Sequence, residues 1–194
     1  DPLDKRLGTD GRPNPGCEVR IVDDAGIDLP TGVEGEVAVR GAERFLGYTD
    51  PELNAVSFLT GGWFLTGDIG RLDAEGYLAI TDRKKDIIIR GGENISSREI
   101  EELLLQVPGV REAAAIGAPD PRLGERICAV VTLDDGAAVT VTEIDAAFCR
   151  IGVARQKTPE LVVVVEEFPR TPSGKIQKAE LRRELGASGR LALP

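Results

Sequence analysis

A lysine near the C-terminal end of the chain stands in a loop suited to phosphate chemistry. Residues 171–175 read Thr-Pro-Ser-Gly-Lys, so a stiff segment is followed by a flexible one that presents the ammonium group of Lys175. The segment is not a P-loop, because position 169 is Pro and Ile176 follows the lysine. A mobile lysine suits a reaction in which two anions meet, since it neutralises the charge that builds on a phosphoryl group. Taken alone, Lys175 is better explained as a solvated loop lysine.

A carboxylate and a guanidinium lie fifteen residues apart earlier in the chain. Asp68 closes the run Gly-Trp-Phe-Leu-Thr-Gly-Asp at residues 62–68, and Arg83 belongs to a charged run at residues 82–86. In a tight turn, the two oxygens of Asp68 could accept hydrogen bonds from vicinal hydroxyls, as carboxylates do with ribose. Arg83 could add a fork of donors to the same sugar or to a phosphate. The structural alternative is that Asp68 only satisfies its own turn and that Arg83 lies on a solvated face, and spacing alone favours it for either residue separately.

A pair of glycines forms the third candidate. Gly91 and Gly92 follow Arg90, and the short apolar segments on either side predict a tight hairpin with a Gly-Gly turn. The same pair leaves a surface without side chains, along which a narrow ligand could slide. On spacing alone the turn is the favoured explanation.

Composition narrows the chemistry further. The 194 residues include no His and no Met, and the formal net charge is −9. Without His, the chain cannot build a Ser-His-Asp triad, a Cys-His dyad or an HExxH zinc site. The acidic balance disfavours nonspecific binding to nucleic acid, and no apolar run reaches the ~20 residues needed for a membrane span. The prediction is a cytoplasmic protein, and the missing Met favours a piece of a longer chain.

The three cysteines, Cys17, Cys128 and Cys149, are far apart and odd in number. They predict small buried side chains in a reducing compartment, and neither a disulfide nor a metal site.

The elements that must position these residues fall into two parts. Residues 1–82 are rich in Gly and Pro and predict a β-rich subdomain, a small distorted barrel with little helix. Residues 87–194 alternate helices and strands and predict a compact α+β domain with a small central sheet and flanking helices. The charged run places the boundary, with a hinge at residues 83–86. The segments expected in the second part are a helix after a Ser96 cap, strands at 113–116 and 127–131, a helix capped by Thr142, a strand at 161–165 and a helix at 179–185.

Together the segments resemble the C-terminal part of the adenylate-forming superfamily, which includes acyl-CoA synthetases, peptide-synthetase adenylation domains and firefly-type luciferases. The similarity runs over residues 8–185. Residues 35–48 resemble the family's GE...G...GY strand motif, and residues 63–68 its TGD motif. Residues 82–101 resemble its hinge and CoA-loop motif, and residues 169–175 its PRTxSGK motif. Four motifs in the family's order make this resemblance specific.

The resemblance implies a role for each candidate. Asp68 and Arg83 would bind the ribose of ATP and its neighbouring groups, and Lys175 would be the catalytic lysine of adenylation. Lys85 would be the hinge about which the C-terminal domain rotates, although many members carry Asp there. Residues 90–92 (Arg-Gly-Gly) would line the pantetheine tunnel of CoA after rotation.

The resemblance also implies the substrates: ATP, CoA and a small-molecule carboxylic acid, fatty or aryl. The phosphate loop, the Mg²⁺-binding motif and the acyl pocket would belong to an N-terminal remainder of the enzyme, so this chain should not adenylate an acid by itself. Within the superfamily, residues 85–95 favour an acyl-CoA synthetase of fatty-acid metabolism over a peptide-synthetase adenylation domain, and Ile89 disfavours a luciferase. The non-enzymatic alternative is a regulatory or interaction module that kept the fold. Retention of Asp68, Arg83, Lys85 and Lys175 together argues against it.

Overall fold

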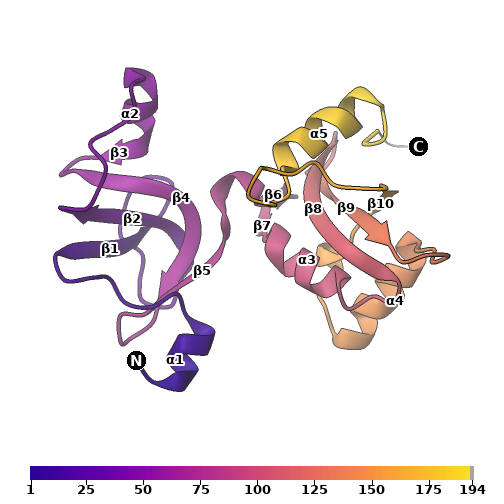
Figure 1. Cartoon of the computed structure of the whole chain (residues 1–194), viewed down its shortest axis with the longest axis horizontal. Helices are drawn as coiled ribbons and strands as arrows, with labels where there is room; N and C mark the ends of the chain where they lie inside the picture. Colours follow the sequence, from indigo (N-terminus) through magenta and orange to yellow (C-terminus); the bar gives the residue numbers. More distant parts are fainter. Residues whose placement is uncertain (193–194) are drawn as a thin grey trace. The chain divides into compact units, whose positions relative to one another are not determined.

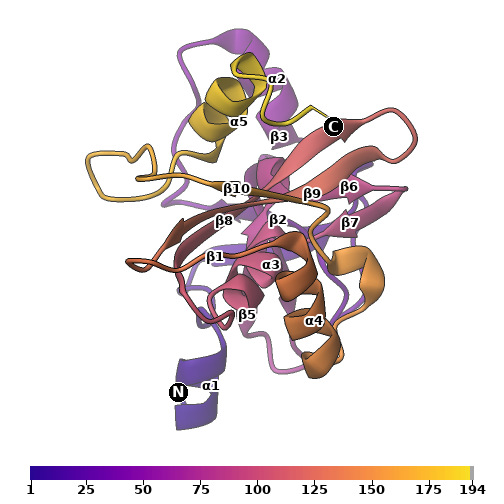
Figure 2. The same ribbon diagram turned by 90° about the vertical axis from the view of Figure 1, so that its right-hand side faces the viewer.

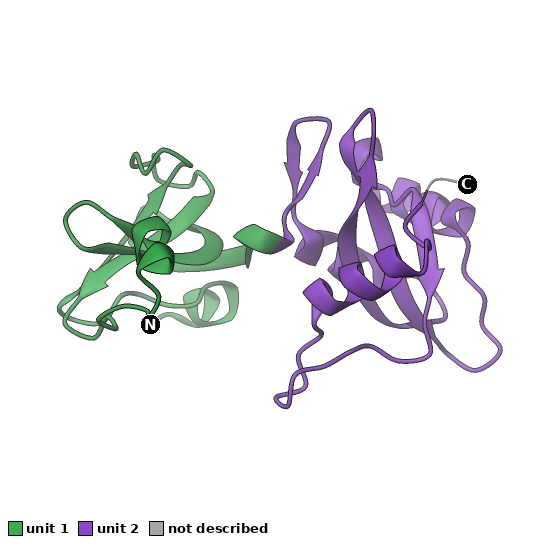
Figure 3. Ribbon diagram, turned by 90° about the horizontal axis from the view of Figure 1, so that it is seen from above, with its two compact units in different colours: residues 1–85 green, residues 86–194 purple. Residues whose placement is uncertain are grey.

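The computed structural model describes residues 1–192 and divides the chain into two compact units, residues 1–85 and the chain from residue 86 onward (Figure 3). The division falls between Lys85 and Asp86. Each unit has its own β-sheet, as the sequence predicts.

The first unit is a curled antiparallel sheet (Figure 1). The strand order is β1-β2-β4-β3, and β5 also pairs with β4. Two short helices lie outside the sheet and bury none of their residues. The elements are α1 (Leu3–Gly8), β1 (Cys17–Val22), β2 (Gly35–Gly41), α2 (Pro51–Ser57), β3 (Phe58–Leu59), β4 (Trp63–Leu72) and β5 (Leu78–Arg83).

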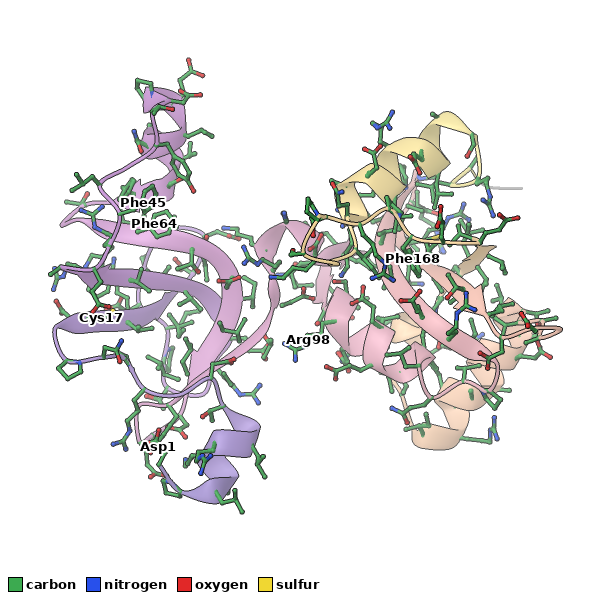
Figure 4. All side chains as sticks on the ribbon, in the orientation of Figure 1. Asp1, Cys17, Phe45, Phe64, Arg98 and Phe168 are labelled. Carbon is green, nitrogen blue, oxygen red and sulfur yellow. The ribbon has the colours of Figure 1, made fainter. Side chains whose placement is uncertain are left out.

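The core of this unit is small and lies against the inner strands. Ile21, Val22, Val37, Ala38 and Tyr77 are its buried apolar residues. A separate aromatic cluster forms at one edge of the sheet, and two of its four ring pairs pack edge to face, a favoured geometry for aromatic rings, while the two pairs of Phe58 are tilted (Figure 4). Its members are Phe45, Tyr48, Phe58 and Phe64.

The second unit has three layers, with helices on both faces of a five-stranded sheet (Figures 1 and 2). The antiparallel pair β8–β9 is its centre, and the strand order is β10-β9-β6-β7 with β10 parallel to β9. The helices, strands and 3₁₀ turns are η1 (Lys84–Asp86, which spans the division), β6 (Ile88–Arg90), β7 (Glu93–Ile95), α3 (Ser97–Leu104), β8 (Val110–Asp120), β9 (Gly124–Leu133), α4 (Val141–Ile151), η2 (Arg155–Lys157), β10 (Leu161–Val164) and α5 (Lys178–Ala187).

Alternation along the two central strands explains the layers. Successive side chains of a strand point to opposite faces. Ala115 and Ile127 therefore join the core beneath α3 and α4, where Phe148 is fully buried. Ile116 and Val130 join a second core beneath α5, together with Leu181. The predicted fold class is confirmed in both units.

Two local predictions were wrong. The cap of α4 is Thr140, two residues before the predicted Thr142, because Thr140 forms a reciprocal capping box with Glu143. Among the cysteines, Cys128 is buried, whereas Cys149 is exposed and Cys17 is half-buried. Burial raises the pKa of the Cys128 thiol to about 12.

Candidate functional site

Asp68 and Arg83 lie opposite each other on neighbouring strands of the first unit. They are register partners of β4 and β5, and Arg83 Nε lies 2.6 Å from Asp68 Oδ1. The sequence predicted Asp68 in a tight turn, which is wrong, because the residue lies inside β4. A local irregularity explains the difference: the register of β4 against β2 shifts at this point, and Gly67 takes a φ of +74°.

The bulge fixes how the Asp68 carboxylate is presented. The hydroxyl of Thr66 donates to the backbone oxygen of Val37 at 3.0 Å and accepts from the backbone N–H of Asp68 at 3.1 Å. Oδ1 of Asp68 is occupied by Arg83. The Asp68 side chain keeps 19% of its surface exposed, so the second oxygen can accept from a hydroxyl group of a ligand.

In the segment that follows β5, Lys84 is held by two carboxylates, whereas the next residue, Lys85, is not paired with a described residue. The ammonium group of Lys84 lies 2.7 Å from Asp24 Oδ1 and 2.9 Å from Glu36 Oε2. These contacts raise the pKa of Lys84, with Asp24 the larger cause and Glu36 the next favourable one. Lys85 is exposed, and no described residue pairs with its side chain.

Lys175 projects from a loop that is closed by its own hydrogen bonds. The backbone N–H of Thr171 donates to the oxygen of Lys175 at 2.9 Å, and the N–H of Lys175 donates to Thr171 Oγ1 at 3.1 Å. Gly174 takes a φ of +85° inside this turn. Arg170 anchors the loop, because its guanidinium donates to the oxygen of Gly174 and pairs with Glu112 of β8. The Lys175 side chain is exposed, and no described residue pairs with its ammonium group.

The predicted Gly-Gly hairpin is confirmed. β6 and β7 pair with Arg90 opposite Glu93, and the two residues between them, Gly91 and Gly92, have φ values of +60° and +86°. Positive φ at both central residues is the requirement of the tightest hairpin turn. The backbone N–H of Gly91 donates to the oxygen of Leu123 at 2.8 Å, which fixes the turn against the start of β9.

Arg90 does not project freely beside these glycines. Its Nε and Nη2 lie 2.7 and 2.5 Å from Glu160 Oε1, while the other oxygen of Glu160 accepts from the N–H of Ile127 at 2.9 Å. Arg90 and Glu160 form one wall of a cavity of about 450 Å³, which Arg155 and Thr142 also line. The lining holds two guanidinium groups and the hydroxyl groups of Thr142 and Thr158, which suit a phosphorylated ligand, together with the carboxylates of Asp145 and Glu160.

The lysine loop and the glycine hairpin attach to opposite ends of the β8–β9 ribbon, as Figure 2 shows. Arg170 holds the loop at Glu112 near the start of β8, whereas the hairpin pairs with Gly124, the partner of Asp120 at the end of β8. Eight residues of extended strand separate Glu112 from Asp120, which corresponds to about 26 Å. The β8–β9 ribbon of the second unit therefore carries the Lys175 loop at one end and the glycine hairpin at the other.

Several residues that complete these sites were not predicted. Glu160, Glu112 and Glu36 each neutralise a cation of a motif, and each lies far from that cation in the sequence. No spacing signal could have found them, because the pairing depends on strand register. Arg182, which pairs with Asp86 of the hinge motif at 3.3 Å, is likewise distant from its partner in the sequence and was not predicted.

Two features were not found in the part of the chain that the structure describes: a cluster of metal ligands and a membrane-spanning helix. Within residues 1–192, no group of three or more His, Cys, Asp or Glu side chains is placed to hold a metal ion. None of the helices in this part of the chain is long and apolar enough to cross a bilayer.

Comparison with protein families matches both units. Residues 1–49 match the family described as AMP-binding enzyme, and residues 99–175 match the AMP-binding enzyme C-terminal domain. The second match ends at Lys175.

Curated relatives align with nearly the whole chain. A medium-chain fatty-acid–CoA ligase of Escherichia coli K12 is 50% identical over 187 residues, covering 95% of this chain and 33% of that protein. A salicylyl-CoA synthase/salicylate adenylyltransferase of Streptomyces is 43% identical, covering 94% and 33%. Triostin synthetase I of Streptomyces triostinicus is 41% identical, covering 98% and 36%. The chain thus spans about a third of the length of the curated relatives it matches.

Solved structures agree in fold. ATP-bound MatB from Rhodopseudomonas palustris aligns with a TM-score of 0.84 at 37% identity, over 92% of this chain and 36% of that one. The o-succinylbenzoate CoA synthetase of Bacillus subtilis, in complex with its acyl-adenylate intermediate, aligns at 0.81 with 36% identity and the same coverage.

Proposed function

We propose that this chain, which belongs to the AMP-binding enzyme family, forms the hinge and lid of an acyl-CoA synthetase. The complete enzyme would convert a carboxylic acid and ATP to an acyl-adenylate and pyrophosphate, and would then transfer the acyl group to the thiol of CoA. The acid is fatty or aryl, as in the medium-chain and salicylyl relatives. The observation that carries the proposal is that the Lys175 loop and the glycine hairpin lie at opposite ends of the β8–β9 ribbon, and each is suited to one half-reaction.

In the first half-reaction, the free ammonium group of Lys175 supplies positive charge. A carboxylate oxygen of the acid attacks the α-phosphorus of ATP, the bond to the β-phosphate bridging oxygen breaks, and pyrophosphate leaves. Both reacting groups are anionic, so a cation between them lowers the barrier most as charge accumulates in the transition state. Asp68 would hold the ribose through Oδ2, with Arg83 fixing the orientation of its carboxylate. Mg²⁺ would accompany the nucleotide's phosphates.

In the second half-reaction, the hairpin at Gly91 and Gly92 faces the acceptor. The thiolate sulfur attacks the acyl carbonyl, the bond to the AMP oxygen breaks, and AMP leaves. Two exposed glycines present backbone without side chains, so the narrow pantetheine arm can lie against them. The cavity beside this hairpin, where Arg90 is already paired with Glu160, offers the guanidinium group of Arg155 to the phosphates of CoA.

Lys85 is the proposed pivot between these two half-reactions. It is the last residue of the first unit and is exposed, with Lys84 and Asp86 on either side held by ion pairs. A hinge of this kind absorbs a large change in φ and ψ over very few residues.

One other acceptor has specific support. The alternative is a peptide-synthetase adenylation domain, in which the acceptor is a different thiol, and one relative is a synthetase that is not named as a CoA ligase. An assay that supplies the acyl-adenylate with free CoA separates the two, because a carrier-dependent domain would leave free CoA unacylated.

The experiment that tests the proposal is Lys175→Ala in the complete enzyme. We expect ATP–pyrophosphate exchange to fall by about 100-fold or more, because the cation of the first transition state is lost. Thioester formation from supplied acyl-adenylate should stay within about twofold, since Lys175 is not used there. Arg183→Ala, which removes another exposed cation of the same unit, is the control and should affect neither step. Equal loss of both steps in Lys175→Ala would contradict the assigned role.

A further inference from the structure

The residues on either side of Lys85 are anchored in different units. Before it, Lys84 pairs with Glu36 of β2 and with Asp24 of the loop that follows β1. The Glu36 side chain is only 8% exposed, whereas that of Asp24 is 88% exposed. Because an exposed ion pair contributes little and a buried carboxylate needs its cation, Glu36 is the stronger anchor of Lys84.

After Lys85, the chain is fixed again at once. Asp86 is nearly buried, and both terminal nitrogens of Arg182 lie 3.3 Å from its Oδ1. Two residues later, Ile88 is fully buried in the core beneath α3 and α4. Arg182 belongs to α5, the helix that directly follows the Lys175 loop, so Asp86 is joined to the element next to the catalytic lysine.

In the 3₁₀ turn η1, the first and third residues are therefore held by ion pairs, and the residue between them is not. Lys84 and Asp86 each hold an ion pair inside one unit, while the exposed side chain of Lys85 forms no hydrogen bond or ion pair with a described residue. Every further residue released at a hinge would add two soft backbone dihedrals. The set of orientations open to the second unit would widen accordingly.

We propose that Lys84 and Asp86 are positioning residues that confine the rotation between the units to the backbone of Lys85. The two pairs, Lys84 with Glu36 and Asp86 with Arg182, are called here the hinge clamps. The proposal rests on the proposed function, in which Lys85 is the pivot. The clamps act through the pivot and touch no substrate, and their effect is to make the end points of the rotation reproducible.

The chain supplies its own labelling sites for a direct test. Cys17 lies in the first unit and is half-buried, and Cys149 lies in the second and is exposed, so both accept a nitroxide spin label. Cys128 is buried and its raised pKa keeps the thiol protonated, so it stays unlabelled. Double electron–electron resonance on the 194-residue chain then gives the distribution of distances between the units.

We expect narrow peaks for the unmodified chain and peaks about twice as wide for Lys84→Met and for Arg182→Met, because each variant frees a residue beside the pivot. Arg71→Met and Arg183→Met are the matched controls. Arg71 pairs with Glu34 within the first unit. Arg183, which follows Arg182 directly in α5, pairs with Glu180 of the same helix. Neither control touches the hinge, so their distributions should be unchanged.

Lys84→Met leaves the buried Glu36 without its cation, so a second variant guards against unfolding. Lys84→Met/Glu36→Gln removes the clamp and the stranded charge together, and it should broaden the distribution equally. Unchanged widths in this double variant and in Arg182→Met, with circular dichroism showing folded chains, would overturn the proposal.

The measurement needs no substrate, which keeps the two proposals separable. Broadened distances in an enzyme without ligase activity would support the clamps and reject the proposed function. Ligase activity with distances that do not respond would reject the clamps alone.

Discussion

At the scale of single residues, Lys175 shares with Lys85 the lack of an ion-pair partner among the described residues, unlike the other motif cations Arg83, Lys84 and Arg90. Arg83, Lys84 and Arg90 are each neutralised by a carboxylate of their own unit, whereas no described residue pairs with Lys175. A paired guanidinium orients the carboxylate it binds, but that carboxylate largely neutralises the positive charge of the guanidinium. The free ammonium group remains available to an incoming anion, as the proposed adenylation role needs.

Asp73 gives a residue-scale prediction about pH. Lys5 and the backbone N–H of Tyr77 lower the pKa of Asp73 from its ordinary 3.8 to about 2, with the bond to Lys5 the larger cause. A lowered folded-state pKa contributes stability that is complete above the unfolded-state value and is lost as the pH falls through the folded one. We expect the melting temperature of the chain to drop between about pH 4 and pH 2, and Asp73→Asn to reduce that drop.

The matched control for Asp73→Asn is Asp28→Asn. Asp28 also pairs with a cation, Arg20, but its side chain is 65% exposed. The acid dependence of this control should equal that of the unmodified chain. If Asp73→Asn shows the same acid dependence as Asp28→Asn, the Lys5 contact contributes nothing in solution.

Sequence reasoning at this scale found the residues that act by type and missed their partners. Lys175 and Gly92 were recognisable because a lysine after Ser-Gly and a paired glycine have local meanings. Glu160 had none, since its value lies in accepting from Arg90, 70 residues earlier in the chain. A register between strands brings such pairs together, and register cannot be read from one segment.

At the scale of elements, the glycine hairpin was predictable and β4 was not. Gly91 and Gly92 sit between two short apolar runs, the simplest hairpin signal. Trp63–Leu72 carries Gly67, Asp68 and Gly70, which interrupt the alternation that marks a strand. Gly70 is required there, because a Cβ atom would lie 2.7 Å from the backbone oxygen of Ala79. The interruption that hides β4 in the sequence is the bulge that presents Asp68.

Gly92→Ala tests the hairpin. The residue has a φ of +86°, and a Cβ atom there would meet nothing within 4 Å, so the substitution acts through the backbone and costs about 1 kcal/mol. We expect it to slow thioester formation by about tenfold while sparing adenylation, because the methyl group stands on the surface proposed for pantetheine. Kinetics of both half-reactions in the complete enzyme measure this.

Gly136→Ala is the control for that substitution. Gly136 has a φ of +75° with the same open surroundings, in the connection between β9 and α4. It should lose a similar amount of stability and leave both half-reactions unchanged. Equal slowing by the two variants would assign the effect of Gly92→Ala to destabilisation.

The cap of α4 provides the second element-scale prediction. Thr140→Ala removes the hydroxyl that accepts from Glu143, so we expect the free energy of unfolding to fall by about 1 kcal/mol. Thr142→Ala changes the cap that the sequence predicted and should alter it by less than about 0.5 kcal/mol. Urea denaturation followed by circular dichroism compares them, and a larger effect at Thr142 would restore the original assignment.

At the scale of the whole molecule, the chain is two folding units joined at Lys85. The order of four motifs predicted this family, and the fold of both units followed from it. The geometry of the joint did not, because the partners of Lys84 and Asp86 lie in β2 and α5, at opposite ends of the chain.

Lys85→Pro tests the joint. Proline fixes φ near −65° and removes the backbone donor, so a rotation that needs another φ is blocked. We expect pyrophosphate exchange to stay within about twofold and acyl transfer to CoA to fall by about 100-fold in the complete enzyme. Lys85→Ala, which keeps the backbone free, should behave as the unmodified enzyme. Normal rates for both steps in the proline variant would show that Lys85 is not the pivot.

The length of the β8–β9 ribbon has a consequence for timing. Its two ends are fixed about 26 Å apart on one rigid unit, so a reaction centre smaller than that distance can face one end at a time. Adenylation and acyl transfer would then exclude each other in space. A CoA molecule that arrives early would wait without reacting, and the sequence of the two steps would be kept by geometry rather than by binding strength.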